Sequence, residues 1–200
     1  GPNNIDIHGV GTNVPGYEVS WNCYDRLISH EMKTVNGTQY YDRDKFKMEL
    51  ADDMNVGDMS VTFKLKKNAV FHDGTPVKAK DVKWSLDRAV TVGGFPTFQM
   101  GAGSLTKPEQ FVVVDDNTVR VDFLRKDRLT VPDLAVIVPA IYNSELVKKH
   151  ASEKDPWGLE YTKQNTAGSG AYRVVSWNAG TEVILERNDK WTGGPLPKVR

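Results

Sequence analysis

The chain has 200 residues, and its 26 lysines and arginines balance its 26 aspartates and glutamates. This length allows one large or two small domains with a real hydrophobic core. The balanced charge gives no indication of a nucleic-acid partner. The longest apolar run, residues 131–142, is too short to span a bilayer and is interrupted by prolines and an aspartate, so we expect no direct membrane insertion.

The cysteine and histidine content gives no sign of a metal or redox site. Cys23 is the only cysteine, so no internal disulfide can form, and we interpret it as a packed helix residue. The four histidines are scattered without metal-ligand spacing, at His8, His30, His72 and His150. We therefore expect no metal and no cofactor.

The first sixty residues predict a loop, a helix and a set of short strands. Residues 3–16 combine glycine and proline with short polar side chains, which is typical of an extended loop. A helix is expected over about residues 17–29. Residues 36–59 mix charges with isolated apolar positions, which indicates short strands and turns, with one turn at Asn36-Gly37.

Residues 60–91 predict a strand, a turn and a helix. Apolar and polar side chains alternate over residues 60–66, the pattern of a half-buried strand. From about residue 80, apolar side chains recur at i, i+4, i+7 and i+8 and form one stripe of a helix. Lys83 and Asp87 lie four residues apart off this stripe, so they can pair.

The turn before this helix raises the question of catalysis. His72 beside Asp73 resembles a general base with its orienting carboxylate. However, Asp73-Gly74 is also a standard turn pair, and the sequence suggests neither a nucleophile nor an oxyanion hole. We therefore expect the His72 ring to bond a backbone group of the turn. A hydrolase that uses His72 and Asp73 remains the alternative function.

The second half of the chain predicts two hairpins and two short helices. Alternating residues indicate hairpins over 111–124 and 171–187, with Gly180 in the left-handed position of the second turn. Short helices are expected around residues 132–136 and 144–150.

Three segments carry a resemblance to a known protein family. Residues 61–88, VTFKLKKNAVFHDGTPVKAKDVKWSLDR, closely resemble the signature segment of the family 5 extracytoplasmic solute-binding proteins. Residues 168–192, GSGAYRVVSWNAGTEVILERNDKWT, are similar to that family's Gly-Thr/Ser-Gly-x-Tyr strand and the hairpin that follows. Residues 22–28, NCYDRLI, resemble its first helix more weakly. One departure is Lys78, which stands where the family commonly has a helix-capping Thr or Ser.

The resemblance implies an α/β fold of the type II periplasmic-binding-protein kind, with a mixed sheet, flanking helices and β-hairpins. Family members are two-lobed and much longer than this chain, which would supply only part of the first lobe, with the second lobe absent. Residues 31–160 would form the outer subdomain of that lobe. Residues 1–30 and 161–200 would form its inner, sheet-bearing subdomain.

The resemblance also implies a function without catalysis. The protein would be the substrate-binding component of an ABC importer, exported to the bacterial periplasm by a signal peptide not present in these residues. As a monomer it would capture a small solute, with a di- or oligopeptide as the leading candidate, and deliver it to the permease subunits. A receptor or signalling role on the same scaffold is a further alternative.

Two segments are candidates for contact with the ligand. By its position relative to NCYDRLI, the loop of residues 9–16 resembles the lobe-one segment that lines the family's cleft, which makes Gly11, Thr12, Asn13 and Val14 candidates. Residues 93–103 read as a glycine-rich flexible loop whose Phe98 and Met100 would suit an adaptable apolar wall. Each segment could equally be an ordinary surface loop, with its aromatic side chains pinning it to the body. We expect these residues alone to bind ligand weakly or not at all, since charged groups of the second lobe would fix a peptide's termini.

Overall fold

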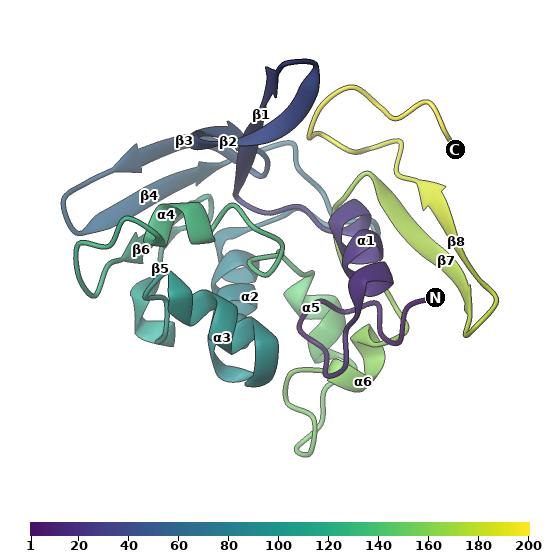
Figure 1. Cartoon of the computed structure of the whole chain (residues 1–200). Coiled ribbons are helices and arrows are strands. Elements are labelled where there is room, and N and C mark those ends of the chain that lie inside the picture. Colours follow the sequence, from purple (N-terminus) through teal and green to yellow (C-terminus); the bar gives the residue numbers. More distant parts are fainter.

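The computed structural model describes all 200 residues (Figure 1). Its helices are α1 (Val14–Cys23), α2 (Ala79–Thr91), α3 (Gly94–Ala102), α4 (Thr130–Asp133), α5 (Ser144–Lys148) and α6 (Leu159–Thr162), with a 3-10 turn at Pro108–Gln110. Its strands are β1 (Ile28–Val35), β2 (Thr38–Met48), β3 (Ala51–Val56), β4 (Ser60–Leu65), β5 (Phe111–Asp115), β6 (Thr118–Asp122), β7 (Tyr172–Asn178) and β8 (Glu182–Arg187).

The strands form three separate sheets, with the orders β1-β2, β3-β4-β6-β5 and β7-β8. Every pairing is antiparallel. The combination of these sheets with six helices confirms the α/β class. The resemblance implied a mixed sheet, but no pair of strands is parallel. Antiparallel pairing fits the connections, because tight turns join β1 to β2, β3 to β4, β5 to β6 and β7 to β8.

The four-stranded sheet confirms the alternation that the sequence predicted. Val61 and Phe63 of β4 are fully buried, and they lie opposite Val121 and Val119 of β6, which are also fully buried. Helix α2 packs against β5 and β6. The apolar stripe of α2 therefore meets the apolar face of this sheet, and the predicted hairpin over residues 111–124 forms its far edge.

Helix α2 begins without a cap from its own N-cap side chain, because Lys78 carries no acceptor. Asp81 supplies the cap instead, accepting a hydrogen bond from the Lys78 backbone N at 3.0 Å. Its other oxygen accepts the Ser144 hydroxyl at 2.5 Å, which ties α5 to α2. The predicted pair between Lys83 and Asp87 is present at 3.1 Å.

Helix α1 lies earlier in the chain than predicted. It begins after Asn13, whose side chain accepts a hydrogen bond from the Gly16 backbone N at 3.3 Å, and Pro15 occupies its first turn. It ends at Cys23, because the next residue is already extended. The predicted continuation to residue 29 was wrong, and strand β1 begins at Ile28 instead.

The last hairpin, β7–β8, returns to α1, and this contact explains two glycines of the 168–192 motif. Gly170 N donates to the Cys23 carbonyl at 3.0 Å. A Cβ atom on Gly170 would lie 2.4 Å from the carbonyl carbon of Cys23, and one on Gly168 would lie 2.1 Å from its carbonyl oxygen. Only glycine allows this close approach. The hairpin is as predicted, with Gly180 at a φ of +81°.

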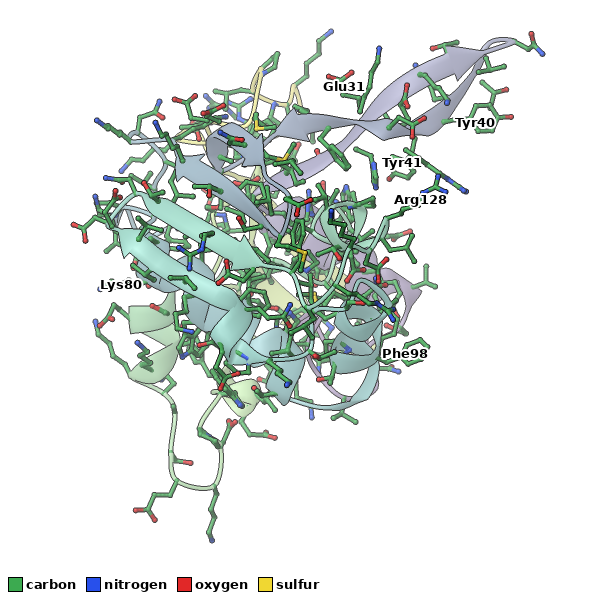
Figure 2. All side chains as sticks on the ribbon, turned by 90° about the vertical axis from the view of Figure 1, so that its left-hand side faces the viewer. Glu31, Tyr40, Tyr41, Lys80, Phe98 and Arg128 are labelled. Carbon is green, nitrogen blue, oxygen red and sulfur yellow. The ribbon has the colours of Figure 1, made fainter.

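The β1–β2 hairpin extends away from the body of the molecule, as Figure 2 shows. Asn36 and Gly37 form its turn with φ angles of 50° and 79°, which confirms the predicted turn. Its second strand, β2, is 11 residues long, which is longer than the short strands predicted over residues 36–59. Most of its side chains beyond His30 are exposed.

A single hydrophobic core of 33 buried residues runs through the chain. The N-terminal segment contributes Ile5 and Ile7, and the segment before α5 contributes Val138 and Ile141. The division into an inner and an outer subdomain stays a prediction.

Candidate ligand-binding site

The loop of residues 9–16 is ordered by its own polar side chains. Thr12 Oγ1 donates to the carbonyls of Asp6 and Gly9, each at 2.8 Å, and Asn13 caps α1. These two predicted site residues therefore shape the loop. Gly11 has a φ of +78° with open space around it, and Val14 is 66% exposed. The solvent-facing part of the loop is its backbone at Gly11 and the Val14 side chain.

The second predicted segment, residues 93–103, is largely helical, and the prediction of a flexible loop was wrong. Gly93 and Gly94 adopt φ angles of 83° and 62°, and α3 starts there. Phe98 is 79% exposed, as a ligand-contacting residue requires. Met100 is fully buried in the core, so it offers no surface to a ligand.

The structure brings these two segments together. Tyr17 of α1 stacks on Phe95 of α3, with ring centroids 5.8 Å apart and an interplanar angle of 17°. Val14 lies one turn before Tyr17, and Phe98 lies one turn after Phe95, so the four side chains follow adjoining helix faces. We call Val14, Tyr17, Phe95 and Phe98 the α1–α3 surface.

Figure 2 shows what else borders this side of the molecule. Phe98, Arg128, Tyr41 and Tyr40 follow one another along the same edge, from α3 to the protruding hairpin. Tyr40 and Tyr41 are 51% and 54% exposed. In this view Phe98 lies well below the two tyrosines, and Figure 1 likewise places α3 far from the β1–β2 hairpin, so the tyrosines are not part of the α1–α3 surface.

His72 and Asp73 do not form a catalytic pair. The His72 ring bonds the Gly170 carbonyl through Nε2 at 3.0 Å. The prediction that it bonds a backbone group of its own turn was therefore wrong, because the partner belongs to a distant segment. Burial lowers the pKa of His72. The Asp73 carboxylate accepts hydrogen bonds from the backbone and hydroxyl of Thr75 and from the Asn143 amide at 2.8 Å. Both side chains therefore hold the turn in place.

A buried polar cluster fixes the start of the candidate loop. Asp6 and Arg88 are both fully buried, and Arg88 Nη2 donates to Asp6 Oδ2 at 2.7 Å. Tyr142 and Thr162 donate their hydroxyls to the two Asp6 oxygens at 2.6 and 2.5 Å. The His8 backbone N donates to Asp6 Oδ1 at 2.9 Å. Three distant parts of the chain, at Arg88, Tyr142 and Thr162, therefore bind this one carboxylate of the N-terminal segment.

The electrostatics of this cluster suit a permanent ion pair. Burial opposes charge on Asp6, but Arg88 and the neighbouring donors hold the pKa of its carboxyl well below the usual range. Burial and the Arg88 charge lower the pKa of His8 to about 4, so that ring is neutral at pH 7. No local pattern in the sequence connects the residues of this cluster. The one feature of the sequence that indicates a buried charge is the position of Arg88 beside the apolar stripe of α2.

No group of three or more His, Cys, Asp or Glu side chains is arranged to hold a metal ion. None of the helices has the length and apolar character that crossing a bilayer requires.

Comparison with curated proteins gives relatives that bind small solutes. The chain is 31% identical over 179 residues to the probable D,D-dipeptide-binding periplasmic protein DdpA of Escherichia coli, covering 88% of this chain and 32% of that protein. It is 28% identical over 163 residues to the glutathione-binding protein GsiB of Pectobacterium atrosepticum, covering 80% and 29%. The chain thus spans about a third of the length of these relatives.

Solved structures share the fold. The Helicobacter pylori periplasmic binding protein DppA, in complex with the peptide STSA, matches with a TM-score of 0.75 and 21% identity over 96% of this chain and 38% of that chain. Listeria monocytogenes OppA bound to peptide matches with a TM-score of 0.72 and 20% identity, over 95% and 37%. These likenesses establish the type II periplasmic-binding-protein fold for the chain. The profile of the bacterial extracellular solute-binding proteins, family 5, matches residues 45–200, and this chain belongs to that family.

Proposed function

We propose that these residues form the ligand-facing part of lobe one in a substrate-binding protein of an ABC importer. The proposal rests on the family membership and on one observation of the structure. The two segments expected to contact a ligand meet through the stacked pair of Tyr17 and Phe95, and they leave Phe98 exposed. Residues 31–160 would be the outer subdomain of lobe one, flanked by inner segments 1–30 and 161–200.

The mechanism we propose is capture without covalent chemistry. The ligand rests against the α1–α3 surface, and a second lobe closes over it. Gly11 supports this role, because its backbone is open to a ligand that approaches the loop. Closure removes apolar surface from water, and this term stabilises the closed complex by about 25 cal/mol per Å².

A di- or oligopeptide is the ligand class that we propose. Relatives are named for binding a D,D-dipeptide and glutathione, and solved proteins of the same fold hold peptides. The exposed Phe98 and the half-buried Tyr17 of the α1–α3 surface would contact apolar side chains of a peptide. The partners would be the permease subunits, the place of action the periplasm, and the working unit a monomer.

The hydrolase alternative has no support from the geometry. Asp73 is occupied by Thr75 and Asn143, and His72 bonds a backbone carbonyl, so neither group orients the other. No specific observation favours a signalling role.

A titration of the longer protein, with its second lobe present, tests this function. Phe98→Ala would remove an aromatic side chain that is buried on binding, which costs about 1.5 to 3 kcal/mol, or about tenfold or more in affinity for a peptide. Val114→Ala is the control, because Val114 is also exposed but lies on strand β5 of the four-stranded sheet. Calorimetry against peptide mixtures, sugars and nickel gives the affinities. Failure of all these ligands to bind, or equal affinity in both variants, would contradict the proposal.

A further inference from the structure

A pocket lies between the end of α1, the base of the β1–β2 hairpin and the segment around Trp191, and it shares no lining residue with the α1–α3 surface. Its volume is about 400 Å³, within the range of small-molecule sites. Both charged and aromatic side chains line it, among them Trp21, Arg26, His30, Lys47 and Trp191. We call it the Arg26 pocket.

Arg26 is the unusual feature of this pocket, because it is buried and only partly hydrogen-bonded. The residue is 3% exposed. Its Nη2 pairs with Glu49 Oε1 at 2.5 Å, and its backbone N donates to Glu49 Oε2 at 2.8 Å. Nε and Nη1 donate to no protein atom. Buried donors are nearly always paired, so unused guanidinium N–H groups in a pocket wall point to an acceptor that comes from elsewhere.

The side chain that packs on the Arg26 guanidinium is Trp21, which lies at the surface. The Trp21 ring lies over the guanidinium, with Cζ 4.2 Å from the ring centroid. Trp21 is itself 37% exposed and lines the same pocket. Trp21 is thus a partly exposed side chain in direct contact with Arg26, and its rotation would give a molecule in the pocket access to the guanidinium.

The charged side chains of the pocket balance, with Arg26 and Lys47 against Asp25 and Glu49, so an incoming anion would be held by free donors and not by net charge. Asp25 is already engaged, because it accepts hydrogen bonds from Trp191 Nε1 at 3.0 Å and from the Ser169 hydroxyl at 2.9 Å. Glu49 is engaged by Arg26. Lys47 is exposed at the rim and takes part in no ion pair.

The His30 ring, on the same wall, has a buried Nδ1 without a partner. The pocket thus has unused nitrogens, while both of its carboxylates already have partners.

We propose that the Arg26 pocket binds a carboxylate group. The unused Arg26 N–H groups donate to its oxygens, the Lys47 ammonium approaches from the rim, and Trp21 closes over the group. This carboxylate has two possible sources, a free ligand or an acidic side chain from residues after Arg200. The second source is geometrically reasonable, because Pro197 lines the pocket and the chain spans only a third of its relatives' length.

The test uses the 200-residue chain and sodium acetate as the probe. The indole N–H signals of Trp21 and Trp191 are followed by ¹H–¹⁵N NMR at pH 7, with sodium chloride holding the ionic strength constant. We expect saturable shifts of both signals with a dissociation constant in the millimolar range, as suits so small a ligand.

Three variants locate the site. Arg26→Lys keeps the positive charge beside Glu49 but loses the unused donors, so acetate should bind at least about tenfold more weakly. Lys47→Gln changes an exposed side chain that does not threaten the fold, and acetate should bind a few-fold more weakly. Arg43→Lys, on an exposed position of the hairpin, is the matched control and should bind acetate like the parent chain.

The outcomes separate clearly. Shifts that rise without saturation, or that sodium chloride alone reproduces, would overturn the proposal. The proposal would also be overturned if the Lys47→Gln and Arg26→Lys variants each bound acetate as tightly as the parent chain. If Arg26→Lys fails to fold, the acetate affinity of Lys47→Gln alone decides. The longer protein then identifies the source. Retained acetate shifts there indicate a free ligand, and acetate shifts that are lost there, while present in the 200-residue chain, indicate an internal acidic side chain.

Discussion

Replacing Asp6 by asparagine is the sharpest perturbation of the candidate loop. The change keeps the shape of the side chain but removes the negative charge that faces Arg88, and both side chains are 0% exposed. Breaking a buried ion pair by removing one partner leaves an uncompensated charge, which costs about 3 to 5 kcal/mol. Since domains are stable by only about 5 to 15 kcal/mol, this single change removes a large part of the total.

The urea midpoint of unfolding measures this loss. With a slope of about 2 kcal/mol per molar urea, Asp6→Asn should lower the midpoint by about 1.5 to 2.5 M at pH 7. Asp122→Asn is the control, because Asp122 pairs with Arg120 at the surface, where the two side chains are 39% and 42% exposed. Water and salt weaken such an exposed ion pair. A drop for Asp6→Asn no larger than that for Asp122→Asn would refute the assignment of Asp6 and Arg88 as the central tie of the loop.

Three other predictions follow from single side chains. His8 is neutral in the fold down to about pH 4 but takes up a proton below about pH 6.5 when unfolded, so acid favours the unfolded state. Between pH 7 and pH 5, His8 should lower the free energy of unfolding by about 2 kcal/mol, as measured by urea unfolding at each pH. If His8→Gln shows the same dependence of stability on pH as the parent chain, this prediction is wrong. Burial raises the pKa of Cys23 to about 12, so its thiol should react with a disulfide reagent only after unfolding, and fast reaction of the folded chain would contradict that burial. Gly170→Ala should lower the melting temperature by several degrees, since its Cβ would overlap the Cys23 carbonyl, whereas Gly180→Ala tests backbone strain without overlap. A melting temperature for Gly170→Ala equal to that of the parent chain would show that this approach is not tight.

Local patterns in the sequence were sufficient for the elements whose neighbours are close in the chain. The alternation of residues 60–66 predicted β4, and the turn residues before Gly180 predicted the last hairpin. The start of α1 was misplaced because Asn13 caps it inside a segment whose glycines and prolines indicate a loop. In residues 93–103 the glycines likewise led to the prediction of a loop. In the structure Gly93 and Gly94 only supply the positive φ angles at the start of α3.

The candidate site could be predicted only in part. One of its segments was identified through the family resemblance and the other through the glycines around Phe98 and Met100, but the contact between Tyr17 and Phe95 depends on how α1 and α3 pack. The buried pair of Asp6 and Arg88 joins residues 82 positions apart, and no local pattern connects them. The Met100 side chain was misassigned because a methionine in a flexible loop and a methionine on the buried face of a helix look alike in sequence.

The most direct test of the ligand-facing role is photo-crosslinking in the longer protein. A photoreactive p-benzoylphenylalanine replaces either Phe98 on α3 or Val114 on β5, and a bound peptide is then irradiated. If the α1–α3 surface faces the ligand, the peptide becomes attached at position 98 and not at position 114. A bound peptide that becomes attached at position 114, and not at position 98, would contradict the account.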